Sequence, residues 1–486
     1  MNAPRPAWLT YGRSLAGVVA AGAILRLGLL ARQPLGYDED FTAAVVTRPF
    51  GEMIEAVSRD SGPPLFYAVE WLIAHVGADP WALRLVPALA GIALIPLLAA
   101  LGRRVAGDAA GLWAAAVAAF LPATVLMSLN ARMYAPAGTL VVAALLLGCR
   151  ALETPTWRSQ LGRWIAYGLV AAAAAWTDYF AVPALLGGLL ALTFLRPPGR
   201  TLARATLATG AAIASLGAWF LVAGEQFAHA GEGFWVQPLD ASGAGTLAQL
   251  FAGPPVNAGV PGSGMLVTLQ GIAILAGLTA LVAAAAWIRS AGSAAARRVG
   301  FMLVACSGVV MLVLASLWRP LFEARYVGVM VMPLFALAGV GLAALPRRLA
   351  ALTLLAMAVP SLALGATITH PETEALLPDI ESRVGPVDLV AADPDHYLVL
   401  LSEGSPELRE RLHVLAAGPP PWYYGTAAYP NDAVISVVPA DVIQSGGAVF
   451  WVASPDAPPP ELPAGYRMTY QRCGIDACLT VFEPSP

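Results

Sequence analysis

The chain of 486 residues is 58% hydrophobic and only 12% charged, with a mean hydropathy of +0.68. A soluble protein carries roughly 25% charged residues, so this composition excludes a cytosolic globular enzyme and a disordered chain. The formal net charge of −3 provides no basic field that would favour nucleic acid as a partner. Apolar runs of about 20 residues, the length that spans a bilayer, recur along the chain and indicate a polytopic membrane protein.

Hydropathy predicts about eleven membrane-spanning helices. The first is not a cleaved signal peptide, because it contains Arg26 and no small-residue cleavage site follows it. The predicted spans cover 14–32, 81–101, 110–129, 133–149, 164–177, 180–195, 205–223, 265–288, 300–317, 327–345 and 349–368.

The placement of arginine gives the orientation, because cytoplasmic loops are enriched in basic residues. With the N-terminus inside, acids collect in the outer connections and most arginines collect in the inner ones. The segment from about residue 370 onward then lies outside the membrane. The inner arginines are Arg5, Arg13, Arg103, Arg104, Arg150, Arg158, Arg163, Arg196, Arg200, Arg204, Arg289, Arg297, Arg298, Arg347 and Arg348.

One apolar stretch, residues 63–77, tests this topology. Counting it as a span would invert every later loop and place Arg103 and Arg104 outside. The stretch is short for a span and contains Glu70 and His75. It is therefore expected to be an amphipathic helix that lies along the outer interface.

The chain divides into two predicted domains. Residues 1–369 form the membrane domain, whose long outer loops are 33–80 and 224–264. The second loop contains GEGFW (231–235) and FAGPP (251–255), and is either a mobile loop over a cavity or a plain connector. In residues 370–486, VDLVAA (387–392) and AVFWVAS (448–454) predict strands and SPELRERLHVL (405–415) predicts a helix. This segment is expected to form a small extracytoplasmic α/β domain.

The four cysteines fall into two groups. Cys473 and Cys478 flank GIDA, and a hairpin closed by a disulfide between them suits an oxidising exterior. Cys149 and Cys306 lie within predicted spans and are expected to be packing residues.

Three adjacent acids, Asp38, Glu39 and Asp40 in YDEDF (37–41), follow the first predicted span. Their mutual repulsion tends to raise the pKa of at least one of them, which favours a general base. Two other interpretations stay open: a solvated acidic loop, and a divalent-metal site formed by the same trio. No neighbouring histidine or HExxH pattern supports the metal site.

Arginines at the outer ends of predicted spans form a second group: Arg84, Arg132 and Arg325. Arginine stays charged in a low-dielectric site and binds phosphate with two hydrogen bonds. Tyr134 and Tyr326 follow two of these arginines closely; the alternative for such pairs is a snorkelling arginine beside an interfacial aromatic.

Asp178 in WTDYFA (176–181) lies between two predicted spans, where it either binds a sugar hydroxyl or an arginine, or caps a turn. Acids and arginines at one face above an apolar bundle suit a substrate with a lipid tail, a phosphate and a polar headgroup.

From about residue 10 to 345 the sequence resembles the GT-C superfamily, specifically bacterial glycosyltransferases related to protein O-mannosyltransferases and aminoarabinose transferases. Two positions depart from the family pattern: Gly62, where a histidine or similar polar residue is usual, and Asp178, where histidine is frequent. They leave the sugar and the acceptor open. The motifs that carry the resemblance are DEDFT (38–42), DSGPPLFY (60–67), WALRLVPALAG (81–91), ARMYA (131–135), DYFA (178–181) and ARY (324–326).

The resemblance implies an inverting transfer of a sugar from a polyprenyl-phosphate donor to an acceptor hydroxyl on a glycan, lipid or protein. It places the enzyme in the bacterial plasma membrane with its active site outside. Asp38 is the expected base and Glu39 the second acid. Arg84, Arg132 and Arg325, with Tyr134 and Tyr326, are expected to hold the donor phosphate. Asp60, Asp178 and Tyr179 are expected to bind substrate, and no cofactor is expected.

Three other functions stay open. A flippase of lipid-linked sugars needs a similar bundle, but it should show inverted repeats and broken helices near mid-membrane. A non-catalytic receptor would use the outer domain to bind cell-envelope material and would not need Asp38. A ligase that uses a diphosphate donor shares the lipid requirement.

Overall fold

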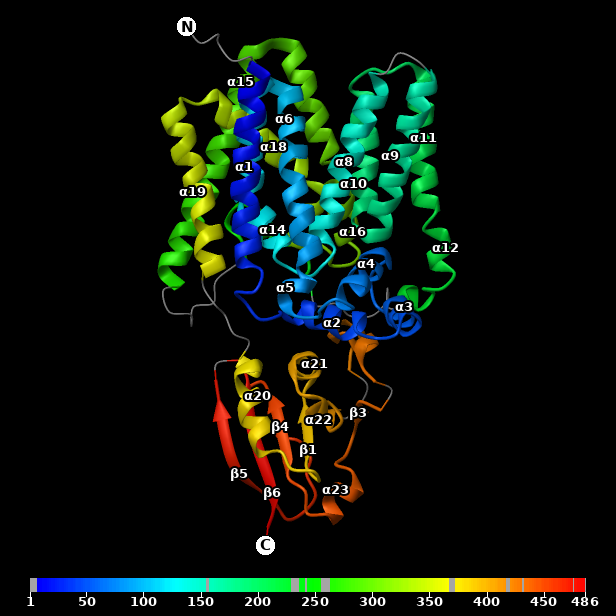
Figure 1. The fold of residues 1–486 in the computed structure, drawn as a ribbon, viewed down its shortest axis with the longest axis vertical. Coiled ribbons are helices and arrows are strands. Elements are labelled where there is room, and N and C mark those ends of the chain that lie inside the picture. The colour runs from blue at the N-terminus through cyan, green and yellow to red at the C-terminus, as the bar shows by residue number, and fades with distance from the viewer. Residues whose placement is uncertain are drawn as a thin grey trace.

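Figure 1 shows the computed structural model, in which a helical bundle stands over a small sheet domain. The structure describes residues 7–153, 157–228, 236–240, 243–254, 263–366, 372–416, 420–430, 432–474 and 476–485. The motif GEGFW (231–235) and the predicted domain boundary at 369/370 lie outside the described residues.

Each predicted span falls on helix. Two pairs of spans are joined in long helices that turn sharply where glycine adopts a positive φ, at Gly107 (φ 82°) in α6 and Gly292 (φ 78°) in α15. Only glycine adopts this backbone conformation without strain. The bundle helices are α1 (Ala7–Leu29), α6 (Leu85–Phe120), α8 (Tyr134–Leu152), α9 (Trp157–Thr177), α10 (Ala181–Thr193), α11 (Gly199–Ala214), α15 (Ser263–Ala305), α16 (Gly308–Ser316), α18 (Met332–Ala344) and α19 (Arg347–Ala366).

The number of spans stays a prediction. Among the described residues, 4 helices are long and apolar enough to cross a membrane alone. A fifth is added if α17 (Ala324–Met330) and α18, bent by 71° at their junction, count as one span.

The arginine-rich connections meet at one end of the bundle. The Arg103 guanidinium lies 4.5 Å from the ring centre of Tyr11 in α1, and Arg104 forms an ion pair with Glu153 after α8. Arg298 of α15 donates a hydrogen bond of 3.2 Å to the carbonyl of Val105 in α6. The C-terminal domain lies at the opposite end (Figure 1). The arginine-rich connections and the C-terminal domain therefore lie at opposite ends of the bundle, and which end faces the cytoplasm stays a prediction.

Arg26 of α1 is fully buried, and its hydrogen bonds connect α1 to two other helices. Its guanidinium donates to carbonyls of Ala118 and Ala119 at the end of α6 and to the carbonyl of Thr124 in α7 (Pro122–Ser128). Two further bonds reach Ser128 and Gly22. All five guanidinium N–H groups therefore have acceptors, which is how a charge is tolerated at membrane depth.

The first long predicted loop, 33–80, forms four short helices across the end of the bundle that faces the C-terminal domain (Figure 1). They are α2 (Tyr37–Val46), α3 (Phe50–Arg59), α4 (Leu65–Ala74) and α5 (Pro80–Leu83). The 10 residues of α4 extend only about 15 Å, half of the bilayer core. Leu72 is 62% exposed, whereas Glu70 is fully buried. The stretch 63–77 therefore does not span the membrane.

The C-terminal domain is a six-stranded sheet in the order β3-β2-β1-β4-β6-β5, flanked by helices. β1 pairs in parallel with β2 and with β4, and β2 pairs in parallel with β3. β6 pairs antiparallel with both β4 and β5. The strands are β1 (Leu389–Ala392), β2 (Leu412–Leu415), β3 (Val434–Ile435), β4 (Val449–Ala453), β5 (Tyr466–Cys473) and β6 (Cys478–Pro484), and the helices are α20 (Glu372–Arg383), α21 (Pro394–Glu403), α22 (Pro406–Arg409) and α23 (Ala440–Gln444).

The predicted helix over 405–415 is wrong in its second half. α22 ends at Arg409, and Leu412–Leu415 forms β2, with Leu412 paired to Val390 of β1. The four residues LHVL are too few to show a periodicity that separates a buried strand from the end of a helix. The strands predicted at 387–392 and 448–454 are present as β1 and β4. A disulfide joins Cys473 to Cys478 at the β5–β6 turn.

Candidate active site

A cavity of about 370 Å³ opens where the bundle helices meet α2 and the C-terminal domain. Segments far apart in the sequence contribute to its wall: α2, the α3–α4, α7–α8 and α9–α10 turns, the segment before α17, and the 3-10 helix η2 (Trp422–Tyr424). Eight of the residues predicted from the sequence line it: Asp38, Asp60, Arg132, Tyr134, Asp178, Tyr179, Arg325 and Tyr326.

Asp38 lies between the two arginines that were predicted to face it. Its carboxylate forms an ion pair with Arg325, and its backbone carbonyl accepts a 3.2 Å hydrogen bond from Arg132. Burial raises the pKa of Asp38, but the charges of Arg325 and Arg132 outweigh burial and hold that pKa below its usual value. In this state the carboxyl group is ionised and is held by Arg325.

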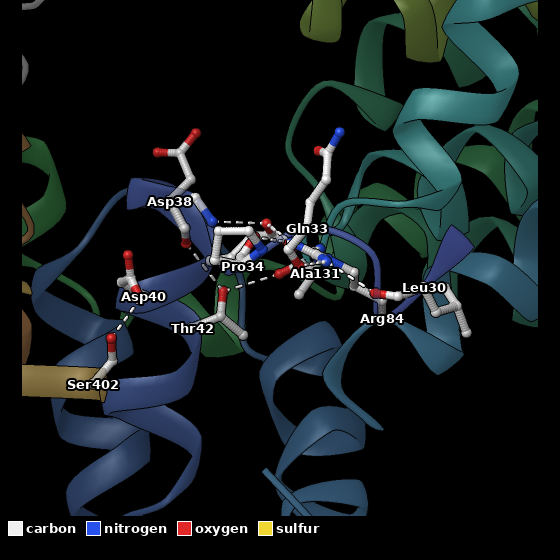
Figure 2. A network of polar contacts seen from close by, with 11 residues as sticks. Leu30, Gln33, Pro34, Asp38, Asp40, Thr42, Arg84, Ala131 and Ser402 are labelled. Carbon is white, nitrogen blue, oxygen red and sulfur yellow. Dashed lines mark hydrogen bonds and ion pairs between the residues drawn. The ribbon is translucent and has the colours of Figure 1, made fainter. Parts of the chain in front are cut away.

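The three adjacent acids point in three directions because successive residues on a helix are rotated by about 100°. Figure 2 shows the Asp38 carboxylate directed away from the network around Arg84, and Asp40 directed toward Ser402 of α21. Glu39 pairs with Arg84. These carboxylates do not converge, so the trio does not fit a divalent metal ion.

Glu39 and Arg84 form a buried structural pair rather than part of the cavity. Two hydrogen bonds of 2.7 and 2.6 Å join them, and both residues are less than 5% exposed. Arg84 also donates to the carbonyls of Leu30, Gln33 and Pro34, at 2.7 to 2.9 Å. The predicted roles of Arg84 in phosphate binding and of Glu39 in catalysis are thus corrected, because the two side chains bond to each other and neither residue lines the cavity that holds Arg132.

Glu39 further fixes the backbone around the site. Its carboxylate accepts hydrogen bonds from the backbone N–H of Gly36 (2.9 Å) at the start of α2 and of Ala131 (2.7 Å) in the α7–α8 turn. Thr42 reinforces this junction with a 3.0 Å bond to the Ala131 carbonyl (Figure 2). The pair thereby holds Asp38 and Arg132, which are neighbours of these anchored residues, at a fixed separation.

Aromatic rings surround Arg325 in the cavity wall, and the rings of Phe41 and Tyr67 lie 5.7 and 6.0 Å from the Arg132 guanidinium. The Arg325 guanidinium lies 5.7 Å from the ring centre of Tyr134 and 5.6 Å from that of Tyr326. Phe180 stacks on Tyr326 with ring centres 4.1 Å apart. Such rings favour a cation and exclude water, which strengthens the attraction of the arginines for an anion.

Two further carboxyl groups face the cavity without full hydrogen bonding. One oxygen of Asp60 and one of Asp178 have no partner among the described residues. Asp178 accepts a 2.9 Å bond from the backbone N–H of Phe180, and burial, opposed by this bond and by Arg132, raises its pKa to about 6. Burial likewise raises the pKa of Asp60. Because both residues line the cavity, these buried oxygens without partners suit the hydroxyl or amino groups of a sugar that enters it.

Asp178→Asn is expected to stabilise the protein at neutral pH. A carboxyl group whose folded pKa is raised binds its proton more tightly in the folded state, so stability falls as pH rises from about 4 to about 6. The shift from 3.8 to about 6 corresponds to a penalty on the order of 3 kcal/mol above that window. Asparagine keeps the acceptor for Phe180 without the charge.

Thermal unfolding of the full chain in detergent checks this expectation. The variant should unfold at a higher temperature than the wild type near pH 8, and the gap should narrow near pH 5. The exposed Glu52→Gln serves as the control with no such pH dependence. An unchanged gap between the two pH values would contradict the assignment.

Several residues that line the cavity were not predicted from the sequence. Arg319 follows α16 at its outer end, and its guanidinium lies 6.0 Å from the ring centre of Trp422 in the C-terminal domain. Gln226 of α13 (Glu225–Ala228) accepts from Tyr179 (2.7 Å) and donates to the carbonyl of Gly62 (3.0 Å). The sequence could have indicated Arg319, because it is another arginine on the side predicted to be outer. No feature of the sequence indicated that Trp422 and Tyr423 line the cavity.

Comparisons with known proteins agree with this architecture. A family model described as dolichyl-phosphate-mannose-protein mannosyltransferase matches residues 61–221. ArnT from Cupriavidus metallidurans in the apo state superimposes with a TM-score of 0.65 at 15% identity, covering 96% of this chain and 97% of that one. The same protein bound to undecaprenyl phosphate gives a TM-score of 0.59.

A more distant solved structure also shares the fold. The oligosaccharyltransferase AglB from Archaeoglobus fulgidus, in complex with an inhibitory peptide and a dolichol-phosphate, has a TM-score of 0.51 at 12% identity over 91% of this chain and 69% of that one. A search of curated proteins finds no significant match. The family match and the shared fold confirm the expected resemblance to GT-C membrane glycosyltransferases.

Proposed function

We propose that the chain transfers a sugar from a polyprenyl-phosphate-linked donor to an acceptor hydroxyl at the outer face of the bacterial plasma membrane, with its N-terminus in the cytoplasm. One observation carries this proposal: a carboxylate and two arginines, Asp38, Arg132 and Arg325, line a single cavity at the end of the bundle opposite the basic loops. Structures of this fold bound to undecaprenyl phosphate and to a dolichol-phosphate support the choice of carrier.

The ion pair between Asp38 and Arg325 defines the first step of the proposed mechanism. A donor phosphate that enters the cavity competes with Asp38 for Arg325 and adds negative charge near the carboxylate. Both effects raise the pKa of Asp38 from its lowered value. Donor binding thus converts Asp38 from a paired carboxylate into a competent general base.

Transfer then proceeds in one inverting displacement. The acceptor oxygen forms a bond to the anomeric carbon and gives its proton to Asp38, while the bond from that carbon to the phosphate oxygen breaks. The leaving polyprenyl phosphate takes the bonding electrons, and Arg325 and Arg132 stabilise its growing charge. Because arginines supply this charge, the proposed reaction needs no divalent metal.

The sugar and the acceptor are assigned to different parts of the site. Asp60 and Asp178 offer acceptors for sugar hydroxyls or an amino group, and Tyr134 and Tyr326 flank the phosphate position beside Arg325. Tyr179 is held by Trp219 at 2.9 Å and by Gln226, and it supports the cavity wall beside Asp178.

The test is a transfer assay with the full chain in liposomes that contain labelled polyprenyl-phosphate sugars. Release of polyprenyl phosphate together with labelled acceptor supports the proposal. Movement of intact donor between leaflets without any release would favour a flippase instead, and the absence of both would favour a receptor.

Arg325→Ala is expected to lower donor turnover by roughly 10²- to 10³-fold. This is the usual effect of removing one hydrogen-bond donor that stabilises a developing negative charge. The assay is single-turnover release of polyprenyl phosphate, scored per folded molecule. Arg32→Ala, an exposed arginine at the outer end of α1, is the matched control and should keep wild-type release. Normal donor use by Arg325→Ala would remove the phosphate role.

A further inference from the structure

A second cavity of about 420 Å³ adjoins Asp38 and is lined by residues of both the membrane domain and the C-terminal domain. Tyr37, Asp38, Arg325 and Tyr423 line both cavities. The base of the proposed reaction therefore borders both spaces. The first space is also lined by Arg132 and Arg319, whereas the second is lined by polar groups of α2, Asn130 and the C-terminal domain.

The side of the C-terminal domain that faces this cavity is the carboxyl edge of its parallel strands. Asp395 comes shortly after β1, and Tyr423 and Tyr424 lie in the connection from β2 to β3. The parallel neighbours of β1 are β2 on one side and β4 on the other. Open α/β sheets bind ligands at this edge, in the crevice where strand connections diverge.

The domain is held against the membrane helices by contacts around the cavity. The Tyr37 hydroxyl donates to the carbonyls of Tyr424 (2.8 Å) and Pro394 (3.3 Å), and Arg48 donates to the carbonyl of Ala428. Ser402 of α21 donates to Asp40, which is fully buried. The cavity is thus a defined space in the docked protein rather than a gap between loosely joined domains.

The charges around the second cavity do not balance. Glu39 is neutralised by Arg84, Asp38 by Arg325, and Asp393 pairs with His396. Asp395 has no ion pair among the described residues. One carboxylate therefore stays uncompensated at the wall, beside two tyrosine side chains.

We propose that the second cavity is the acceptor subsite, and that Asp395 with Tyr423 and Tyr424 restricts it to neutral or cationic hydroxyl-bearing acceptors and rejects phosphorylated ones. This inference rests on the proposed function, because Asp38 must reach an acceptor hydroxyl from one side and the donor sugar from the other. Among the described residues, Arg325 lines this cavity but is paired with Asp38, so an anionic acceptor would meet Asp395 with no unpaired arginine to compensate it. A polyol would instead find carboxylate, carbonyl and phenol groups.

The charge of the cavity can be measured without any turnover. Asn130→Cys in the full chain is labelled near pH 8 with a cationic and an anionic methanethiosulfonate reagent of similar size. The cationic reagent should react faster by on the order of tenfold, and Asp395→Asn should reduce that ratio severalfold. Ser445→Cys, at the exposed residue that follows α23, is the control whose ratio of rates Asp395→Asn should not change. Equal rates at Asn130→Cys would overturn the proposal.

A second experiment compares two acceptors: a neutral oligosaccharide, and the same oligosaccharide carrying a terminal phosphate. Wild-type kcat/KM should favour the neutral acceptor by at least about tenfold, and Asp395→Arg should reduce or reverse that preference. Equal use of both acceptors by the wild type overturns the acceptor proposal while leaving the proposed function intact. If no donor releases polyprenyl phosphate, the proposed function fails, and the labelling ratios still decide whether the cavity rejects anions.

Discussion

Asp38→Asn should reduce sugar transfer by about 10²- to 10⁴-fold, the usual contribution of a positioned general base. The amide has the same shape as the carboxyl group and keeps an oxygen for Arg325, so the cavity should keep its form. It accepts no proton from the acceptor hydroxyl. Because the variant also removes a negative charge beside two arginines, donor affinity should stay equal or increase.

Steady-state transfer and donor binding, measured on the same preparation, separate the two effects. A loss in kcat with an unchanged or lower KM for the donor fits the assigned role. Glu52→Gln on α3, an exposed acid outside the cavity, should behave as the wild type. Near-normal turnover of Asp38→Asn would show that another group takes the proton, with Asp60 the next carboxyl group in the same cavity.

Topology explains why so much of the site follows from the sequence. The motifs DEDF, ARMYA, DYFA and EARY each adjoin a predicted span on the same side of the membrane. Once the arginine distribution had placed these four connections on one side, their side chains had to meet near one surface. The structure brings them together in one cavity with Asp38 and Arg325 in contact.

The sequence did not reveal in which direction each acidic side chain of the short helix α2 points. Asp38, Glu39 and Asp40 are adjacent and chemically alike, and the sequence assigned the first two to catalysis. α2 begins at Tyr37, and its rotation sends Glu39 inward to Arg84 and Asp40 toward the C-terminal domain. That rotation is set by tertiary packing, since α2 contacts α21, α4 and α3.

Domain docking accounts for the other residues that were missed. Trp422, Tyr423 and Gly425 enter the cavity wall only because the C-terminal domain packs on α2. Gly425 has φ 68° and approaches Phe41 so closely that a Cβ there would lie 3.0 Å from the ring. No local pattern in PPPWYYG indicates contact with a segment almost four hundred positions earlier.

Glu39→Gln should destabilise the protein by about 3 to 5 kcal/mol, because it leaves the Arg84 charge buried without a counter-charge. The Glu39–Arg84 pair is almost inaccessible to solvent, with side chains 5% and 4% exposed. Turnover per folded molecule should fall far less than in Asp38→Asn, since Glu39 neither lines the donor cavity nor faces the sugar. The two neighbouring acids thus predict opposite phenotypes: lost stability for Glu39, lost chemistry for Asp38.

Thermal or denaturant unfolding in detergent, with turnover normalised to folded protein, measures both quantities. Asp108→Asn breaks an exposed ion pair with Arg103, in which the two side chains are 48% and 49% exposed. This control variant should lose no more than about 1 kcal/mol of stability.

Adding Arg84→Leu to Glu39→Gln removes the unpaired charge, so the double variant should lose less stability than the two single variants lose together. It should not regain wild-type stability, because the carbonyls of Leu30, Gln33 and Pro34 lose their donor. A stable Glu39→Gln protein with turnover as low as that of Asp38→Asn would return Glu39 to the catalytic machinery.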